Sequence, residues 1–303
     1  MVIIIIDSEG ICRKELTGKE IIHVDCVDHV YPDGTMSLEG ICFSVNPGEI
    51  VAICGPNGSG KTTLLEHLVG ILTPKKGRII MFGKELKKKR YKEIRKKVGF
   101  IFQNSDDQLF APTVMDDVMF GPRNLGFTKE ESYQKAYDAL ETVFGEFPKD
   151  LIEKIPHYLS GGEKKLVAIA GILAIEPKAI VADEITANLD PYHCGLVERV
   201  LIKLKEELDI SVVFATHNLD MALRLADRVC LIDKGAVIKE GNPEEILLDE
   251  SIHELDLQIP HILSIYKYFC KLFPNLTTKP IPRRVEDLNE LIGDLFKKKE
   301  ILL

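Results

Sequence analysis

Residues 50–62, IVAICGPNGSGKT, decide the fold of this chain. Residues 50–53 are apolar and predict a buried strand, and helical spacing of apolar residues begins at Lys61. Between them, residues 55–62 match G-x-x-x-x-G-K-[ST], in which small residues let successive backbone N–H groups curve around a phosphate. The helix N-terminus adds partial positive charge. The sequence therefore predicts a phosphate-binding loop between a buried strand and a helix.

Two residues of this loop have distinct expected roles towards a nucleoside triphosphate. Lys61 is expected to reach the β- and γ-phosphates, and the Thr62 hydroxyl to ligate Mg²⁺. A chance match in a chain of this length occurs about once in 100, because Gly makes up only about 7% of residues. The residues predicted to bind ATP here are Gly55, Pro56, Asn57, Gly58, Ser59, Gly60, Lys61, Thr62 and Thr63.

An acidic pair completes the predicted nucleotide site. The apolar run 179–182 predicts a buried strand that carries Asp183 to its C-terminal tip, where the carboxylate can hold Mg²⁺. Glu184, one residue later, can polarise a water. Such a pair alone is as often a plain turn. Its pairing with the phosphate loop favours the nucleotide interpretation.

Buried strands that alternate with helices indicate an α/β fold with a largely parallel sheet. Strands are expected over 21–31, 41–45, 50–53, 78–82, 98–102, 179–182, 212–216, 229–233 and 236–239. Helices are expected over 61–72, 130–143, 162–174, 195–208 and 219–225. After Gly241 the pattern changes to short helices punctuated by prolines, which places a domain boundary within 241–250.

The composition limits the class of protein. With 39 basic and 47 acidic residues the net charge is −8, which argues against non-specific binding to nucleic acid or anionic lipid. The longest apolar run, 166–175, is too short for a membrane helix, and seven cysteines without a CxxC pair indicate reduced thiols. These features predict a soluble intracellular protein. The basic run 84–97 is interpreted as a solvated face, with membrane or partner docking as the alternative.

A Ser-Gly-Gly loop lies between the two halves of the predicted site, at 159–163, followed by a helical pattern. Here the chain resembles the ATP-binding cassette (ABC) ATPases, whose signature is such a loop at a helix N-terminus. Further motifs follow in the family's order: the stacking aromatic Tyr31, the Q-loop Gln103, the D-loop 187–190 and the switch His217. Alone, Tyr31 would more often be a core residue and His217 a structural or surface one.

This resemblance implies an ABC ATPase fold of the P-loop NTPase class: a parallel-sheet core, an antiparallel β subdomain and a helical signature subdomain at about 104–172. The expected divisions are an N-terminal extension 1–19, an ATPase domain 20–243 and a small α/β appendage 244–303 for dimerisation. The implied cofactors are ATP and Mg²⁺. The implied site residues are Glu184, His217 and Gln103 for catalysis, Tyr31, Ser160, Gly161 and Gly162 for ATP, and Thr62, Gln103 and Asp183 for the metal.

A narrower resemblance is to the ATPase subunits of energy-coupling-factor importers for cobalt, nickel or vitamins. It rests on residues 99–110 and 112–126, with an Ile-Pro element at 259–260. In that family the segment 106–110 grips the transmembrane subunit, so Leu109 and Phe110 are expected to be exposed. The acidic pair 106–107 is also interpreted as an N-cap pair for a helix, and this interpretation and the docking role are compatible.

The resemblance implies a second ATPase subunit, identical or a paralogue, a transmembrane coupling subunit and a substrate-binding membrane subunit, with no nucleic acid. The expected location is the cytoplasmic face of the cell membrane. The alternative is an ABC ATPase that acts on DNA or the ribosome; only 99 residues separate Lys61 from Ser160, which leaves no room for a long coiled coil. No residue here encodes the cargo.

Three residues depart from the family pattern. Glu163 replaces the usual Gln of the signature, Ile185 replaces the Pro after the catalytic Glu, and Asn188 lies in an unusual D-loop. They bear on rate rather than on activity. Residues 1–19 have no assignment: they can be an extra strand, a disordered lead or a cloning remnant.

Overall fold

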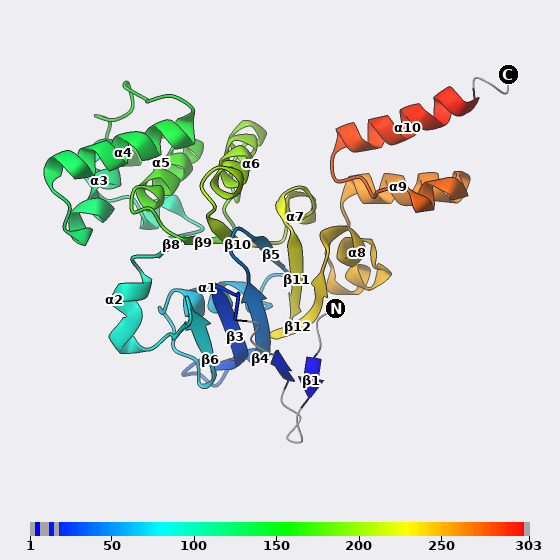
Figure 1. The fold of residues 1–303 in the computed structure, drawn as a ribbon, viewed down its shortest axis with the longest axis horizontal. Coiled ribbons are helices and arrows are strands. Elements are labelled where there is room, and N and C mark those ends of the chain that lie inside the picture. The colour runs from blue at the N-terminus through cyan, green and yellow to red at the C-terminus, as the bar shows by residue number, and fades with distance from the viewer. Residues whose placement is uncertain (1–3, 7–11, 15–17, 300–303) are drawn as a thin grey trace.

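The computed structural model describes residues 4–6, 12–14 and 18–299. Figure 1 shows two stacked sheets, with the helices α3–α5 at one side and α9 and α10 projecting at the other. The strands are β1 (Ile4–Ile6), β2 (Cys12–Lys14), β3 (Ile22–Val30), β4 (Met36–Val45), β5 (Ile50–Cys54), β6 (Lys76–Met81), β7 (Lys84–Glu85), β8 (Val98–Ile101), β9 (Ala179–Asp183), β10 (Ser211–Thr216), β11 (Arg228–Asp233) and β12 (Ala236–Gly241).

Ten α-helices and five 3₁₀-helices are present in the described residues. The α-helices are α1 (Lys61–Leu68), α2 (Tyr91–Ile94), α3 (Val114–Leu125), α4 (Lys129–Phe144), α5 (Gly161–Leu173), α6 (Pro191–Glu206), α7 (Leu219–Leu225), α8 (Pro243–Leu248), α9 (His261–Leu272) and α10 (Val285–Lys299). The 3₁₀-helices are Lys88–Arg90, Ser105–Asp107, Pro156–Tyr158, Glu250–Leu255 and Pro274–Thr278.

The central sheet has the strand order β12-β11-β5-β10-β9-β8. Neighbouring strands run parallel throughout, except that β12 is antiparallel to β11. The carboxyl ends of the parallel strands therefore meet at one edge, where α/β proteins bind ligands. The predicted parallel-sheet core is confirmed.

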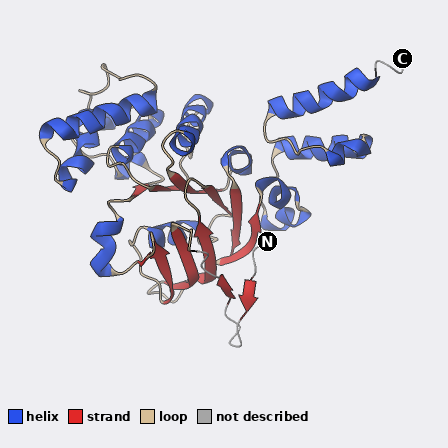
Figure 2. Ribbon diagram, viewed as in Figure 1, coloured by secondary structure: helices blue, strands red, loops and turns tan. Residues whose placement is uncertain are grey.

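The second sheet is antiparallel, with the order β4-β3-β6-β7, as the resemblance implied. β5 joins two hydrophobic cores, because successive side chains of a strand point to opposite faces. Ile50, Ala52 and Cys54 pack in the core with α3–α7, whereas Val51 and Ile53 pack in the core with α1 and the antiparallel sheet. Figure 2 shows α1 between the two sheets.

Helix α3 was not expected from the sequence. Thr113 begins it by accepting a hydrogen bond from the Asp116 N–H, and Gly126 ends it with a φ of 98°. Gly121 and Pro122 disrupt its helical pattern, yet Pro122 lies in the last turns of the helix and is buried there. Tertiary packing outweighs local propensity here.

Two predicted helix boundaries were wrong. The helix expected over 61–72 ends at Leu68, because Gly70 adopts a φ of 66°, and Ile71 is exposed. The helix expected over 195–208 begins earlier, at Pro191, because the Asp190 side chain caps it. Proline suits the first helical position, since its missing N–H would have no helical partner.

The appendage is helical, so the predicted α/β character was wrong: the described residues of 244–299 form helices and no strand. Its apolar residues recur at helical spacing, as in the buried Ile262, Leu263 and Tyr266 of α9. Arg283 attaches it to the ATPase core by donating to the Ala226 carbonyl at 3.0 Å. The same guanidinium forms a bidentate pair with Glu244 within the appendage.

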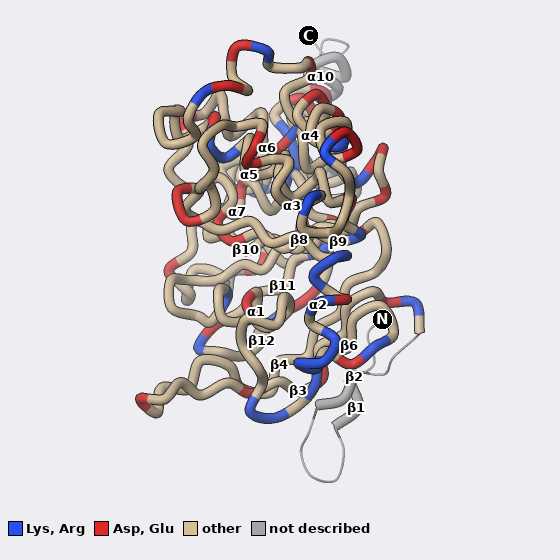
Figure 3. Tube along the Cα trace, turned by 90° about the vertical axis from the view of Figure 1, so that its left-hand side faces the viewer, with Lys and Arg blue, Asp and Glu red and all other residues tan. Residues whose placement is uncertain are grey.

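Within the N-terminal extension, residues 4–6 and 12–14 pair as a two-stranded antiparallel sheet, which agrees with an extra strand there. Residues 1–3, 7–11 and 15–17 of the expected extension lie outside the described residues. The basic run 84–97 is largely exposed, in line with a solvated face. Figure 3 shows its Lys and Arg residues, in blue, along the chain around α2. None of the described helices combines the length and apolarity that a membrane span needs.

Candidate nucleotide site

A cavity of about 460 Å³ lies at the carboxyl edge of the central sheet. It brings together predicted site residues from segments far apart in the chain. Its lining residues are Tyr31, Thr35, Met36, Ser37, Asn57, Gly58, Gly60, Lys61, Thr62, Thr63, Gln103, Asp183, Glu184 and His217. Sequence reasoning missed Thr35, Met36 and Ser37; their position after the turn that follows Tyr31 was the available signal.

The phosphate loop is shaped by glycines that no other residue can replace. A Cβ at Gly60, whose φ is 102°, would lie 2.6 Å from the Ser37 carbonyl oxygen, and one at Gly55 would lie 2.1 Å from the Ile232 carbonyl oxygen. The Lys61 ammonium donates to the carbonyls of Gly55 and Pro56, both at 2.9 Å. Burial lowers the pKa of Lys61. The cation is thus held at the loop that would receive a phosphate.

The Asp183 carboxylate lies next to this loop, and one of its two oxygens can accept a further ligand. The Thr62 hydroxyl donates to Asp183 Oδ2 at 2.7 Å. The other carboxylate oxygen, Oδ1, is buried without a hydrogen-bond partner among the described residues. Burial raises the pKa of Asp183. A carboxylate, a hydroxyl and the Gln103 amide in one cavity are oxygen donors of the kind Mg²⁺ takes, so these residues fit that ion.

Glu184 and His217, which both line the cavity, form a pair. His217 Nδ1 lies 2.9 Å from Glu184 Oε1. Glu184 has a φ of 42°, a left-handed conformation that costs free energy in a residue with a side chain, and its N–H donates to the Ala215 carbonyl at 3.1 Å. The Glu184 carboxylate is largely buried, while the His217 ring is mostly exposed.

Tyr31 lies at the rim of the cavity rather than in the core. Its hydroxyl is 3.0 Å from the Thr63 hydroxyl, which also accepts a hydrogen bond from Ser37. The edge of its ring meets His29, with 4.7 Å between centroids. Behind it, His67 is fully buried, and burial lowers its pKa to about 4, so this imidazole is neutral at pH 7.

The Ser-Gly-Gly loop lies outside this cavity. Ser160 and Glu163 form a capping box at the start of α5: the Ser160 hydroxyl accepts the Glu163 N–H at 3.2 Å, and the Glu163 carboxylate accepts the Ser160 N–H at 2.8 Å. That second bond lowers the pKa of Glu163. Gly162 has no room for a side chain, because a Cβ would lie 2.0 Å from the His193 ring. One chain therefore does not bring this loop to its own phosphate loop.

The expected docking segment is exposed at only one of its two apolar residues. Phe110 is 60% exposed and makes an edge contact with the exposed Phe120, with centroids 4.7 Å apart. Leu109 is 3% exposed, so its predicted exposure was wrong: it packs into the hydrophobic core of the helical group. Asp117 fixes the turn by accepting the Phe110 N–H at 2.8 Å.

The N-cap interpretation of the acidic pair 106–107 was also wrong. The cap of the short 3₁₀-helix is Asn104, whose side chain accepts the Asp106 N–H at 3.2 Å. The Asp106 carboxylate instead accepts a hydrogen bond from Lys164 of α5 at 2.7 Å, which lowers the pKa of Asp106.

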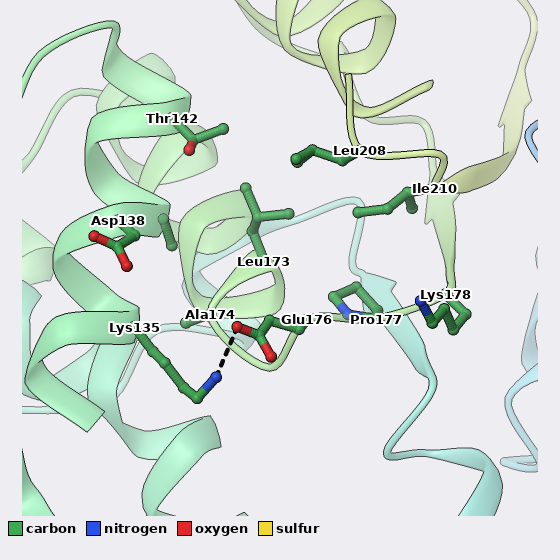
Figure 4. Close-up of a pocket in the computed structure, with 11 residues that line it drawn as sticks. Lys135, Asp138, Thr142, Leu173, Ala174, Glu176, Pro177, Lys178, Leu208 and Ile210 are labelled. Atoms are coloured by element: carbon green, nitrogen blue, oxygen red, sulfur yellow. Dashed lines mark ion pairs between the residues drawn. The ribbon is translucent and has the colours of Figure 1, made fainter. Parts of the chain in front are cut away.

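A second cavity, of about 240 Å³, lies where the helical group meets the central sheet. Figure 4 shows Leu173 and Ala174 at the end of α5 among its lining residues, and the ion pair between Lys135 of α4 and Glu176, whose charged atoms are 2.7 Å apart. None of the predicted site residues lines this cavity. This cavity lies at the junction between α4 and the end of α5.

Comparisons with known proteins agree with this architecture. The family model described as "ABC transporter" matches residues 38–187. The energy-coupling factor transporter ATP-binding protein EcfA of Methanocaldococcus jannaschii is 46% identical over 244 residues, which cover 80% of this chain and 86% of that protein. The solved cbiO1 of Clostridium perfringens, described as part of the ABC transporter complex cbiONQ, superposes with a TM-score of 0.71 at 37% identity, over 82% of this chain and 99% of that chain.

A dimeric cassette also superposes on the chain. MJ0796, solved in a post-hydrolysis state with ADP and Pi, has a TM-score of 0.66 and 28% identity, over 73% of this chain and 98% of its own. The fold and the cavity define an ABC-type ATPase, which binds ATP and couples its hydrolysis to transport. The chain belongs to the energy-coupling-factor type of ABC transporter ATP-binding proteins.

Proposed function

We propose that this chain is the ATP-binding subunit of an importer that uses Mg²⁺·ATP hydrolysis to drive uptake of cobalt, nickel or a vitamin. The observation that carries the proposal is the single cavity that gathers Lys61, Asp183, Glu184 and His217 at the carboxyl edge of the sheet. The likeness to cbiO1, described as part of a transporter complex, favours an importer with separate membrane subunits.

The site residues divide into those that bind and those that act on water. Lys61 and the loop N–H groups bind the phosphates, and Thr62, Asp183 and Gln103 hold Mg²⁺, which neutralises phosphate charge when bound. Glu184 positions and deprotonates the attacking water, and His217 orients its carboxylate. Tyr31 stacks on the adenine from the rim.

The working unit that we propose is a pair of ATPase subunits. Residues 20–243 form the ATPase domain, with a helical subdomain at about 104–172, and 244–303 form the appendage that holds the pair together. The exposed apolar stripe Ile265, Tyr268 and Leu272 on α9 supports that role. The pair binds a transmembrane coupling subunit and a substrate-binding membrane subunit at the cytoplasmic face of the membrane.

The exposed pair Phe110 and Phe120 is the proposed contact with the coupling subunit, because paired exposed aromatic rings mark partner surfaces. We expect Phe110→Ser with Phe120→Ser to abolish co-purification with the membrane subunits, or uptake, while basal ATPase activity stays within about twofold. Ile238→Ser is the matched control: Ile238 is 48% exposed on β12, at the opposite edge of the central sheet from β8. Unchanged uptake by the double variant would place docking elsewhere.

The test of the function as a whole is to isolate the chain from native membranes and identify what co-purifies. Multi-span subunits should co-purify, and vesicles that contain the complex should take up one of labelled cobalt, nickel or a vitamin only when Mg²⁺·ATP is present on the side of this chain. Fractionation with ribosomes or DNA, without membrane subunits, would contradict the proposal.

A further inference from the structure

The signature helix α5 is attached to the segment that carries Gln103. Lys165, one turn past the Ser-Gly-Gly loop, donates from its ammonium to the Phe102 carbonyl at 2.9 Å and to the Gln103 carbonyl at 2.8 Å. Further along, Gln108 donates to the Ala168 carbonyl of α5 at 3.0 Å. These partners lie about 60 residues apart in sequence, so the attachment is a product of the fold.

Lys165 is an unusual core residue. Its side chain is among the largest fully buried ones, with 2% exposure. Its recorded hydrogen bonds end on main-chain oxygens rather than on a carboxylate. Burying an ammonium that is not hydrogen-bonded to a carboxylate costs free energy. Burial lowers the pKa of Lys165 to about 8, although the negative charge of Asp183 opposes this shift. Stability alone does not account for a lysine at this position.

The location of Lys165 explains why a buried ammonium is placed here in spite of its cost in free energy. Gln103 lines the nucleotide cavity, and a neighbouring hollow of about 210 Å³ is lined by Gln103, Gly161, Lys165 and the D-loop residues 187–189. Lys165 therefore sits where the Gln103 loop, the signature helix and the D-loop meet. At 1.5 Å rise per residue, it lies only about one helical turn from the Ser-Gly-Gly loop.

We propose that Lys165 is a positioning residue that fixes the main chain of Gln103 to the signature helix, so that the loop and the helix move as one body when ATP binds. Gln103 then transmits the state of one nucleotide to the Ser-Gly-Gly loop that serves the other. This inference rests on the proposed role of Gln103 at the metal. The other hydrogen bonds between the two segments, from Gln108 and Lys164, lie further along the chain from Gln103. Among the described residues, the hydrogen bond recorded to the Gln103 carbonyl comes from Lys165.

The test is Lys165→Met in the full chain, because methionine has similar length and no donor. The substitution removes the desolvation cost of a buried charge but leaves the Phe102 and Gln103 carbonyls without their donor, and because these two effects oppose each other, Tm should change little. We expect ATP to bind within about threefold of wild type while kcat falls about 10- to 10²-fold, up to the scale of a catalytic group misplaced by about 1 Å. Hydrogen–deuterium exchange of 102–105 in the presence of ATP should rise, with the helix α5 unchanged.

Lys164→Met is the matched control, since Lys164 adjoins Lys165 and pairs with Asp106 at the surface; its kcat should stay within about twofold. A kcat for Lys165→Met within twofold of wild type, or a fall in Tm with kcat retained, overturns the proposal. If Lys165→Met does not fold, Lys165→Gln takes its place: its amide keeps the position polar, but its shorter side chain does not hold both main-chain carbonyls, so the same fall in kcat is expected. Gln103→Ala is measured in parallel: if it is silent, the role of Gln103 fails and this inference with it, whereas silence of Lys165→Met alone defeats only this inference.

Discussion

Glu184→Gln should bind ATP like the wild type and hydrolyse it about 10²–10³-fold more slowly, the usual scale for losing a positioned base. The amide keeps the shape of the side chain and can still hydrogen-bond His217, which lies 2.9 Å from the carboxylate. It cannot accept a proton from the attacking water. Steady-state phosphate release and equilibrium binding of ATP measure the two effects separately.

Glu206→Gln serves as control for this substitution, because Glu206 is an exposed carboxylate in the last turn of α6, outside the cavity. Its turnover should equal that of the wild type. Turnover of Glu184→Gln within twofold of wild type would exclude Glu184 as the base. The water would then need another acceptor, and among the described residues that line the cavity the remaining carboxylate is Asp183, whose Oδ2 already accepts from Thr62.

A mixture of two inactive variants should recover activity if ATP is hydrolysed between two chains. The Ser-Gly-Gly loop does not line the cavity that holds Lys61, so in the proposed pair each chain would supply half of the donors for one γ-phosphate. Lys61→Ala removes the phosphate cation, and Ser160→Arg blocks the other half with a bulky side chain. Each variant alone should hydrolyse at background, because transition-state contacts are missing.

In a heterodimer of these variants, one site pairs the intact Lys61 with the intact Ser160, and the other site has lost both. Random pairing at equal concentrations makes half of the dimers mixed, so about one quarter of wild-type activity should return if the two sites are independent. The measurement is ATPase rate against mixing ratio, with subunit exchange verified by labelled wild-type chains. Background activity at every ratio, with exchange occurring, would contradict the composite site.

Local sequence patterns were enough to predict those features of this protein that depend only on residues close together in the chain. The phosphate loop is specified by small residues at a strand–helix junction, and apolar runs such as 179–182 specify parallel strands buried on both faces. Because parallel strands end at one edge, the order of motifs was enough to predict that Lys61, Asp183 and His217 would lie together. Their placement around one cavity needed no knowledge of side-chain packing.

Tertiary structure alone decided what depends on distant neighbours. Leu109 is buried and Phe110 exposed, although both are apolar residues of one loop, because only Leu109 meets the core of the helical group. Helix α3 forms in spite of Gly121 and Pro122, and Lys165 finds its acceptors about 60 residues earlier in the chain. A local sequence pattern indicates the hydrogen bonding and periodicity within one segment. Whether a particular side chain is buried depends on which other segments pack against it, and the sequence pattern does not show which segments those are.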